Sequence, residues 1–566
     1  MSPAALRSLK IQLAGKRQAQ LKSARRRMVV GLAMFGCLTL LTGARLTELA
    51  LSGIGGPGVA ARSWTGAAPR APIVDRNGND LARSFRAFSL AVKPREVVGD
   101  KDELAERIAA ILGERDPADI ARHLNSKGKW RYIERRVQPD DAVALKALGE
   151  PGLVIDREWE RVYPNRTLAA HTLGYANVDG EGLAGLEREL DARLTDPELA
   201  EVPVALSLDT RVQHQLVQVL TAQMEKHDAI GGAGVVLDVH TGELLALTSQ
   251  PVYDPNAAGR DSLDARFNRA TYGVYELGST FKALTIAMAM DAGVVTSMAQ
   301  GYDASQPVKA GRFRIRDFHA KNRWLSVPEI FMYSSNIGTA HMASALGSDR
   351  QQAYLRKLGM LDRPAVELAE RGRPLYPESW GEISTMTVAY GHGIAVTPLH
   401  LAAAYASLVN GGVYREPTLM KRGPDAVPAG TQVFSPETSS KMNALLRLVV
   451  KEGTGGKAEA AGYRVGGKTG TAEKPKNGGY SRRALVTTFA AAFPMDDPQY
   501  VVVAMLDEPQ GIKETFGYAT AGWTAAPVVG EVVTRIAPIL GVTPSNVKDV
   551  DLTEVMAEVK REKSAG

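Results

Sequence analysis

Residues 275–292 read Tyr-Glu-Leu-Gly-Ser-Thr-Phe-Lys-Ala-Leu-Thr-Ile-Ala-Met-Ala-Met-Asp-Ala, and the part from Thr280 onward is almost wholly apolar. A helix that is apolar on all sides is buried, so this segment predicts a buried helix that ends at Gly293. Ser279 then stands at the N-terminus of that helix. Lys282, three residues further on, lies over the same face.

This Ser-x-x-Lys pair is a candidate nucleophile with its base. A serine hydroxyl is a weak nucleophile until a base removes its proton. A lysine can be that base when its pKa is lowered, and both burial and the helix N-terminus act in that direction. The alternative is a helix cap beside a lysine that reaches solvent, because this spacing occurs by chance in many chains.

A second candidate motif is Tyr333-Ser-Ser-Asn336, which follows a capping box at Ser326-Val-Pro-Glu329. A further helix is expected over Ile337 to Leu346. Ser334 and Asn336 therefore fall on a loop between helices and can point into one cleft, where the serine relays a proton and the asparagine binds an amide. The alternative is ordinary turn chemistry, which favours the same residues.

A third segment, Gly466-Gly-Lys-Thr-Gly-Thr471, has a competing nucleotide interpretation. Residues 462–469 fit the phosphate-binding pattern G-x-x-x-x-G-K-T, and Asp507 ends an apolar run as a Mg²⁺ ligand would. Such a loop must open a helix, but the glycines and proline in residues 470–479 leave room for only about one turn. We therefore reject the nucleotide site and expect Asp507 to end a core strand.

Residues 466–471 are interpreted instead as an edge strand that lines a cleft. Gly470 lets backbone approach closely, and Lys468, Thr469 and Thr471 can bind a carboxylate.

The remaining pattern predicts a catalytic region of mixed helices and strands that follows a smaller α+β module. Residues 53–72 are rich in Gly, Ala and Pro and indicate a linker, and residues 73–200 mix alternating and amphipathic segments without a catalytic cluster. The expected elements are a strand at 204–209, a helix at 210–227, a hairpin at 233–239 and 243–248, strands at 484–493 and 500–506, and a helix at 525–540. Residues 548–566 are charged and are expected to fray.

The excess positive charge of the chain lies at its N-terminus. The 566 residues carry a net charge of +6, and residues 1–27 hold eight basic residues and no acid, so the remaining residues carry −2. Residues 28–566 therefore have no net positive charge that would attract a polyanion, and we expect no nucleic-acid partner. The hydrophobic fraction of 45% excludes wholesale disorder, and a single cysteine, Cys37, excludes an intrachain disulfide.

The basic residues are followed by residues 28–44, which carry no charge. The length of this segment is close to the minimum that can span a bilayer. Positive charge on the near side predicts a cytoplasmic N-terminus, with the bulk of the chain across the membrane. The alternative, a cleaved signal peptide, lacks a clear A-x-A site.

Two further patterns are set aside. Gly180-Glu-Gly182-Leu-Ala-Gly185 has the spacing G-x-G-x-x-G but no strand before it, so we interpret it as loop glycine. The nine histidines show no metal-binding spacing. We assign no metal and no cofactor.

Taken in order, S-x-x-K, S-x-N and K-T-G resemble the class B penicillin-binding proteins. Ser334 lies 55 residues after Ser279, and Lys468 lies 134 residues after Ser334, similar to the spacing in that family. Further landmarks are Ile73–Gly78, Arg161–Pro164, Gly185–Glu187, Asn268–Ala270 and Thr397–Leu399. The resemblance runs from the anchor to about residue 545.

The resemblance implies an α+β multidomain fold with a single N-terminal transmembrane helix, an α+β pedestal domain and a penicillin-binding, serine β-lactamase-like transpeptidase domain. The last of these is an antiparallel sheet flanked by helices. The implied parts are a basic cytoplasmic tail at 1–27, an anchor at 28–51, a linker and pedestal at 52–203, the transpeptidase domain at 204–545 and a charged tail at 546–566.

The asparagine at position 336 makes the chain resemble the division-specific, FtsI-type branch. Elongation-type relatives commonly carry an aspartate at this position. The implied activity is a D,D-transpeptidase that cross-links peptidoglycan stem peptides ending in D-Ala-D-Ala during septum formation and is acylated by β-lactams. The alternatives are an elongation-type transpeptidase, a D,D-carboxypeptidase, a serine β-lactamase and a non-catalytic β-lactam sensor or scaffold. A bifunctional glycosyltransferase is disfavoured by the short segment before residue 204.

The resemblance also implies a role for each residue of the site. Ser279 is the nucleophile, Lys282 its base, and Ser334 with Lys468 returns the proton to the leaving D-alanine. Asn336 holds the peptide amide. Thr469, Gly470 and Thr471 bind the terminal carboxylate, and the N–H groups of Ser279 and Thr471 form the oxyanion hole.

The implied partners are the inner (cytoplasmic) membrane, an FtsW-type glycan polymerase and other divisome proteins, with the catalytic domain in the periplasm.

Overall fold

The computed structural model describes residues 25–43 except 38, 69–113, 115–311, 313–476 and 479–559. They belong to two compact units, residues 1–65 and 66–566, which are described separately. Residues 1–24 and 44–68 lie outside the described part, and with them most of the predicted tail and linker and the end of the predicted anchor. Residues 560–566 lie outside it as well.

The described part of the first unit is one helix, Arg25–Gly43, of 19 residues. It is long and apolar enough to cross a membrane, and its side chains are exposed apart from one intermediate residue. The helix includes three arginines at its start, so it begins three residues before the predicted anchor. Cys37 is exposed on it.

The second unit begins with the predicted α+β module. Its strands are β1 (Ile73–Val74), β2 (Asp80–Val92), β3 (Arg131–Val137) and β4 (Leu153–Val162), and its helices are α2 (Lys101–Leu112), α3 (Pro117–Leu124) and α4 (Pro139–Ala147). β2 pairs antiparallel with both β3 and β4, and the helices cover this sheet through a core that includes Leu90, Ile108, Leu124 and Leu145. The α+β prediction is confirmed.

A buried ion cluster joins this module to the segment that follows it. Glu187 is fully buried in α6 (Gly185–Glu189) and accepts hydrogen bonds from Arg70 Nε and Arg161 Nε, both at 2.7 Å. Arg70 also reaches Asp191 at 2.6 Å. The two arginines are themselves buried, so Glu187 compensates charges that water cannot reach.

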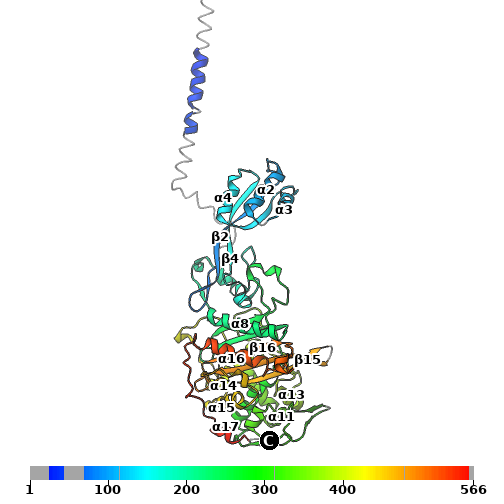
Figure 1. The fold of residues 1–566 in the computed structure, drawn as a ribbon. Coiled ribbons are helices and arrows are strands. Elements are labelled where there is room, and N and C mark those ends of the chain that lie inside the picture. Colours follow the sequence, from blue (N-terminus) through cyan, green and yellow to red (C-terminus); the bar gives the residue numbers. More distant parts are fainter. Residues whose placement is uncertain are drawn as a thin grey trace, which may run out of the picture. The chain divides into compact units, whose positions relative to one another are not determined.

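The catalytic region is built on a five-stranded antiparallel sheet in the order β14-β15-β16-β6-β7 (Figure 1). Its strands are β6 (Gly231–Asp238), β7 (Leu244–Gln250), β14 (Gly466–Lys476), β15 (Gly479–Phe493) and β16 (Tyr500–Asp507). The predicted hairpin and the predicted strand pair are both present. β14 is an edge strand and Asp507 ends β16, as the sequence predicted.

Alternate residues of the strands face two different cores, because successive side chains of a strand point to opposite faces. Val236, Val502 and Ala504 pack against α8 (Thr210–Lys226) and α16 (Ala525–Ile536). On the other face lie α9 (Phe281–Asp291), α14 (Pro398–Val409) and α15 (Pro436–Glu452). Figure 1 labels α14 and α15. This two-layered covering is the predicted helix-flanked sheet.

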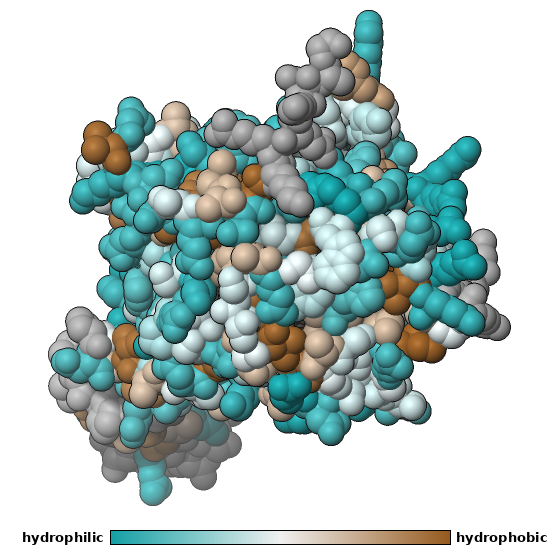
Figure 2. All heavy atoms as spheres, turned by 90° about the horizontal axis from the view of Figure 1, so that it is seen from below, coloured by the Kyte–Doolittle hydropathy of each residue, from teal (hydrophilic) through white to brown (hydrophobic). Residues whose placement is uncertain are grey.

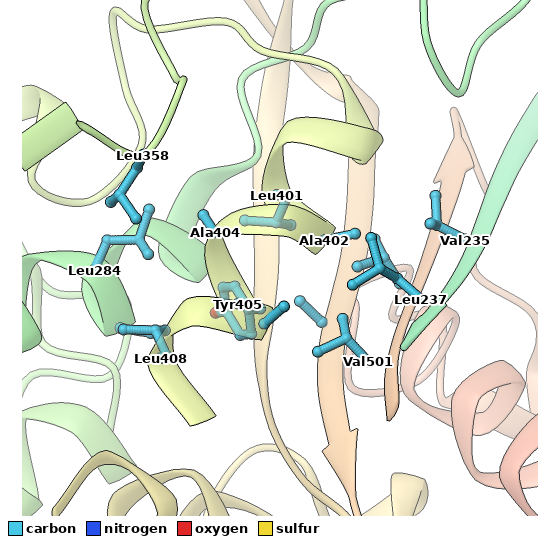
Figure 3. Close-up of a cluster of buried hydrophobic side chains, with 14 of the residues drawn as sticks. Val235, Leu237, Leu284, Leu358, Leu401, Ala402, Ala404, Tyr405, Leu408 and Val501 are labelled. Carbon is cyan, nitrogen blue, oxygen red and sulfur yellow. The ribbon is translucent and has the colours of Figure 1, made fainter. Parts of the chain in front are cut away.

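α14 fills the space between the sheet and α9. Figure 3 shows its Leu401, Ala402 and Tyr405 between Val235 and Val501 of the sheet on one side and Leu284 of α9 on the other. The Tyr405 hydroxyl donates to the Thr280 carbonyl oxygen at 2.8 Å, which fixes the start of α9. α9 is therefore enclosed, as its composition predicted.

The other helices of this region are α10 (Val327–Met332), α11 (Asn336–Leu346), α12 (Ser348–Lys357) and α13 (Glu382–Val388). A short hairpin of β9 (Val308–Ala310) with β10 (Phe313–Ile315) lies before them in the chain. It stands between the antiparallel pair β8 (Gly301–Asp303) and β11 (Trp324–Ser326). The predicted capping box at Ser326 and Glu329 begins α10.

Three expectations differ from the structure. The strand predicted over 204–209 is limited to β5 (Val204–Ala205), which pairs with β1, because Leu206 bridges to Met420 instead. α16 ends at Ile536 rather than residue 540. The fraying predicted after residue 548 is wrong for residues 548–559, which pack against the catalytic region and include α17 (Thr553–Ala557).

Seen from the end of the molecule at which the C-terminus lies, the surface is mostly polar, with apolar residues in small separate patches (Figure 2).

Candidate active site

Ser279 lies in a single 3-10 turn, η4 (Gly278–Thr280), that leads directly into α9. Its side chain is half-buried, whereas Lys282 in the first turn of α9 is fully buried. Gly278 adopts a φ of +56°, and a Cβ there would lie 2.7 Å from the Thr471 carbonyl oxygen. The turn that carries Ser279 thus requires glycine and lies against β14.

Ser334 lies between α10 and α11 with a φ of +60°, in the left-handed region that few non-glycine residues adopt. The conformation is maintained by the neighbouring residues. Ser335 caps α11 by accepting from the Gly338 N–H at 3.0 Å, and its hydroxyl donates to Asp317 at 2.7 Å. Such strain at a reactive position is a mark of a functional site.

Both predicted lysines converge on Ser334. Lys282 Nζ donates to Ser334 Oγ at 3.1 Å and also to the Ser334 carbonyl oxygen, and Lys468 Nζ donates to Ser334 Oγ at 3.0 Å. Residues from α9, the turn before α11 and β14 therefore meet at one hydroxyl, although 52 and 134 residues separate them along the chain. This convergence is the centre of the site.

Two buried amines at one hydroxyl cannot both keep their protons easily. Burial lowers the pKa of Lys282 well below its ordinary value, and the charge of Lys468 lowers it further. Burial also lowers the pKa of Lys468 to about 7. A neutral amine is therefore available near neutral pH, as a general base requires.

Ser279 is placed beside this cluster but is not joined to it. Among the residues that the structure describes, no hydrogen bond reaches its hydroxyl, and Lys282, the residue predicted to be its base, does not bond to it. Lys282 is directed to Ser334 instead. In sites without substrate such bonds are often long and form only in the complex.

Strand β14, which carries Lys468, Thr469 and Gly470, contacts the turn of Ser279 through its backbone. A Cβ on Gly470 would lie 2.1 Å from the Leu277 carbonyl oxygen, so only glycine allows β14 to approach this closely. The Thr469 hydroxyl is bonded to Thr454 Oγ1 at 2.7 Å, and Thr471 Oγ1 accepts from the Ala521 N–H at 3.1 Å. Thr469 and Thr471 therefore lie on the strand beside the Ser279 turn.

Asn336 is the first residue of α11 and is half-buried. Its side-chain amide donates to the Arg316 carbonyl oxygen at 2.9 Å. The adjacent Asp317 accepts from the Ile337 N–H at 3.0 Å as well as from Ser335. The segment at 316–317 thus fixes Ser335 and Asn336 of this turn and the start of α11.

Sequence reasoning missed this segment and one further cluster. Glu276, three residues before Ser279, accepts from the Gly393 N–H at 2.9 Å and the Tyr480 hydroxyl at 2.8 Å, and pairs with His392 Nδ1 at 3.1 Å. The hydrogen bond to Glu276 raises the pKa of His392. No local pattern marks these residues, because their partners lie 116 to 204 residues away.

The nucleotide interpretation fails in the structure for the predicted reason. Residues 466–476 continue as strand β14, where a phosphate loop would open a helix. Gly180 and Gly182 lie in a loop. Within the described ranges, no group of three or more His, Cys, Asp or Glu side chains could hold a metal ion.

Two buried lysines beside two serines, at the edge of a helix-covered antiparallel sheet, are the parts of a serine acyl-transfer site. Residues 232–533 match the family described as penicillin binding protein transpeptidase domain, and residues 65–197 match the penicillin-binding protein dimerisation domain. The chain belongs to the transpeptidase family of penicillin-binding proteins, in its class B, FtsI-type branch.

Individual relatives agree with this assignment. The chain is 42% identical over 486 residues to the probable peptidoglycan D,D-transpeptidase FtsI of Caulobacter vibrioides, covering 84% of this chain and 82% of the relative. It is 33% identical over 516 residues to the probable peptidoglycan D,D-transpeptidase PenA of Neisseria meningitidis, covering 86% and 87%.

A solved structure gives the same fold. The crystal structure of penicillin binding protein 3 from Mycobacterium tuberculosis, complexed with aztreonam, matches with a TM-score of 0.67 and 25% identity. The match covers 86% of this chain and all of the other.

Proposed function

We propose that the chain is a membrane-anchored serine D,D-transpeptidase that cross-links peptidoglycan stem peptides through an acyl-enzyme during septal wall synthesis. The observation that carries the proposal is the convergence of Lys282 and Lys468 on Ser334 Oγ, at 3.1 and 3.0 Å, next to the turn that presents Ser279. The names of the relatives at 42% and 33% identity give the same reaction.

In the acylation step, Ser279 Oγ attacks the carbonyl carbon between the two terminal D-alanines of a stem peptide. Neutral Lys282 takes the hydroxyl proton as the C–O bond forms. The backbone N–H groups of Ser279 and Thr471 stabilise the negative charge on the carbonyl oxygen, a contribution of about 10²–10³ in rate. β14 is an edge strand, so alternate N–H groups are not used by the sheet.

The leaving D-alanine needs a proton when its C–N bond breaks. Ser334 is hydrogen-bonded to both lysines and can pass a proton from Lys282 or Lys468 to the departing amine. An ester of Ser279 and a free D-alanine result. The amino group of a second stem peptide then attacks the ester, its proton goes to Ser279 Oγ, and the cross-linking amide forms.

The substrate is held along β14 and the 334–336 turn. Thr469, Gly470 and Thr471 bind the terminal carboxylate beside Lys468, and Asn336 binds the peptide amide. A β-lactam has the same carboxylate and a strained amide, so it acylates Ser279 and is released slowly.

A fluorescent penicillin tests the nucleophile. The wild-type protein is expected to be labelled covalently with slow release, and Ser279→Ala is expected to lose labelling completely while its thermal midpoint stays within a few degrees. Labelling of Ser279→Ala at the wild-type level would overturn the assignment. Rapid release of the label would indicate a β-lactamase.

Transfer to an amine and transfer to water are separated by the products. With a purified stem-peptide substrate, a transpeptidase gives cross-linked dimer, whereas a D,D-carboxypeptidase gives only the shortened peptide and D-alanine. Labelling without either product would favour a sensor or scaffold. Depletion in the native host distinguishes division from elongation, since filaments indicate the former and rounded cells the latter.

The domain boundaries and the topology belong to the same proposal. We place the cytoplasmic tail at 1–27, the inner-membrane anchor at 28–51, the pedestal at 52–203 and the transpeptidase domain, in the periplasm, at 204–545, with residues 546–559 packed against that domain. The helix Arg25–Gly43 and the basic residues before it support this orientation. Protease added outside spheroplasts should degrade the catalytic region and spare an N-terminal tag.

The pedestal is proposed to dock an FtsW-type glycan polymerase and other divisome proteins beside the membrane. Co-purification of that polymerase with the full chain, and its loss when residues 28–51 are exchanged for an unrelated anchor, would support a contact within the membrane. Unchanged recovery would contradict it.

A further inference from the structure

The segment after α16 returns to the catalytic region and contacts the chain just before two of its three motifs. Ser545 N–H donates to the Gly462 carbonyl oxygen at 2.8 Å, four residues before β14 begins. At its other end, the Glu558 carbonyl oxygen accepts from Ser326 Oγ at 2.7 Å. Ser326 caps α10, the helix that leads to Ser334.

The strongest contact of this segment is Asp549 with Arg447 of α15. Arg447 is 2% exposed and donates to the Asp549 carboxylate at 2.9, 3.0 and 2.8 Å. The same guanidinium bonds Glu459 and donates to the Val465 carbonyl oxygen at 2.7 Å. A planar guanidinium with several acceptors holds all of them in a fixed relation.

Val465 is the residue immediately before β14 and lies three residues before Lys468. The start of β14 is packed tightly on α15, since a Cβ on Gly466 would lie 3.0 Å from the Arg447 backbone nitrogen. A change in the position of Arg447 therefore reaches Lys468 through only three residues of extended chain.

Apolar packing supports the same segment. Val555 of α17 is 2% exposed and belongs to the main core, and Val550, Leu552, Met556 and Val559 pack against that core. A charged tail with these buried contacts is part of the catalytic fold. It is not an unattached extension.

We propose that residues 545–559 form a clasp, in which Asp549 and Arg447 are positioning residues that keep Lys468 within hydrogen-bond distance of Ser334. The clasp attaches to the start of β14 through Arg447 and Val465, and to the start of α10 through Ser326 and Glu558. It thereby couples β14, which carries Lys468, to α10, the helix that leads to Ser334. This inference rests on the proposed roles of Lys468 and Ser334 in acylation.

A neutral or shortened side chain at position 549 removes a hydrogen-bond acceptor from the buried guanidinium of Arg447. Asp549→Ala removes all three hydrogen bonds, so Arg447 is free to turn toward Glu459 and solvent and to release Val465. Asp549→Asn keeps the shape but removes the charge and converts one acceptor to a donor. Asp549→Glu restores the carboxylate with one more methylene.

The experiment separates binding from acylation with a chromogenic or fluorescent penicillin and the full-length protein in detergent. Stopped-flow traces give the dissociation constant of the initial complex and the acylation rate constant k2. We expect k2 to fall between about 5- and 100-fold in Asp549→Ala, less in Asp549→Asn, with a dissociation constant near the wild-type value. Asp549→Glu should recover part of k2.

Glu554→Gln, on the exposed side of α17, is the matched control and should keep the wild-type k2. Thermal midpoints are measured for every variant, and k2 is determined well below them. If Asp549→Ala lowers the midpoint while k2 remains at the wild-type value, the segment has only a structural role and the proposal is wrong. If wild-type protein itself is not labelled at Ser279, the proposed function fails, and the clasp with it.

Discussion

In the proposed mechanism, Lys282 is the residue whose titration controls the reaction. Its pKa is lowered by burial and by the nearby Lys468, so its neutral form exists at pH values where a lysine with the ordinary pKa of 10.5 is protonated. The second-order rate constant of acylation should therefore rise with pH, with a slope of one on a logarithmic scale, and reach its plateau well below pH 10.5.

Replacing Lys468 by methionine tests the electrostatic part of this explanation. Loss of the neighbouring positive charge favours protonated Lys282, so the pKa of Lys282 rises. The part of the pH profile in which the acylation rate constant rises, its acid limb, then moves to higher pH. The plateau also falls, because Lys468 contacts Ser334 directly, but the position of the limb is the diagnostic quantity. A limb that stays in place in Lys468→Met would show that burial alone sets the pKa of Lys282.

The residues of the three motifs could be predicted because each motif is local. Ser279 and Lys282 are one helical turn apart, and the apolar composition of residues 280–292 is enough to predict burial. Asp317, Glu276 and Arg447 could not be predicted. Asp317 and Arg447 act on a motif from elsewhere in the chain, and Glu276, although it is three residues from Ser279, is bound by partners 116 to 204 residues away. Single polar residues of this kind leave no periodic signal in one sequence.

At the scale of elements, the site depends on how closely β14 approaches the turn before α9. A Cβ on Gly470 would lie 2.1 Å from the Leu277 carbonyl oxygen, a distance that backbone atoms cannot accommodate without moving. Gly470→Ala should displace β14 from η4 and lower the acylation rate constant by about 100-fold, since displacements near 1 Å have effects of this size.

Gly479→Ala is the matched control for that substitution. Gly479 also lies in the β14–β15 hairpin, and a Cβ there meets nothing within 4 Å. It should acylate at the wild-type rate. Equal rates for the two variants, measured with a fluorescent penicillin on folded protein, would show that the close approach of β14 does not limit the reaction.

The elements themselves were predicted where their pattern is strong. The hairpin of β6 and β7, the antiparallel pair of β15 and β16 and the helix α8 all appear in the expected places. The clearest error is the C-terminal segment, where charge suggested fraying. The apolar residues at 552, 555, 556 and 559 have the i, i+3, i+4, i+7 spacing of an amphipathic helix, and this pattern was outweighed by the charge of the segment.

At the scale of the whole chain, apolar cores and buried charges both stabilise the second unit. The catalytic region has two large apolar cores on either side of one sheet. The junction with the α+β module shares the first of these cores through Ile73, Leu81 and Leu186, and it also buries the charged side chains of Arg70, Arg161 and Glu187. A charge at such a position is tolerated only while its partners remain.

Glu187→Gln should therefore destabilise this junction strongly and leave the reaction unchanged. The carboxylate accepts from both arginines at 2.7 Å, and an amide would direct an N–H group toward one of the two guanidinium donors. Breaking a buried ion pair in this way costs about 3–5 kcal/mol. Urea unfolding followed by tryptophan fluorescence should show a lower midpoint, with Trp159 of β4 close to the junction.

Glu189→Gln provides the comparison, because Glu189 is exposed in the same short helix and its charge is already solvated. Its unfolding midpoint should equal that of the wild type. Both variants should be labelled by penicillin at the wild-type rate in the absence of urea, since Lys282, Ser334 and Lys468 are held by α9, α11 and β14 and by no part of the junction. A loss of labelling in folded Glu187→Gln would instead show that the α+β module acts on the acylation site through this cluster.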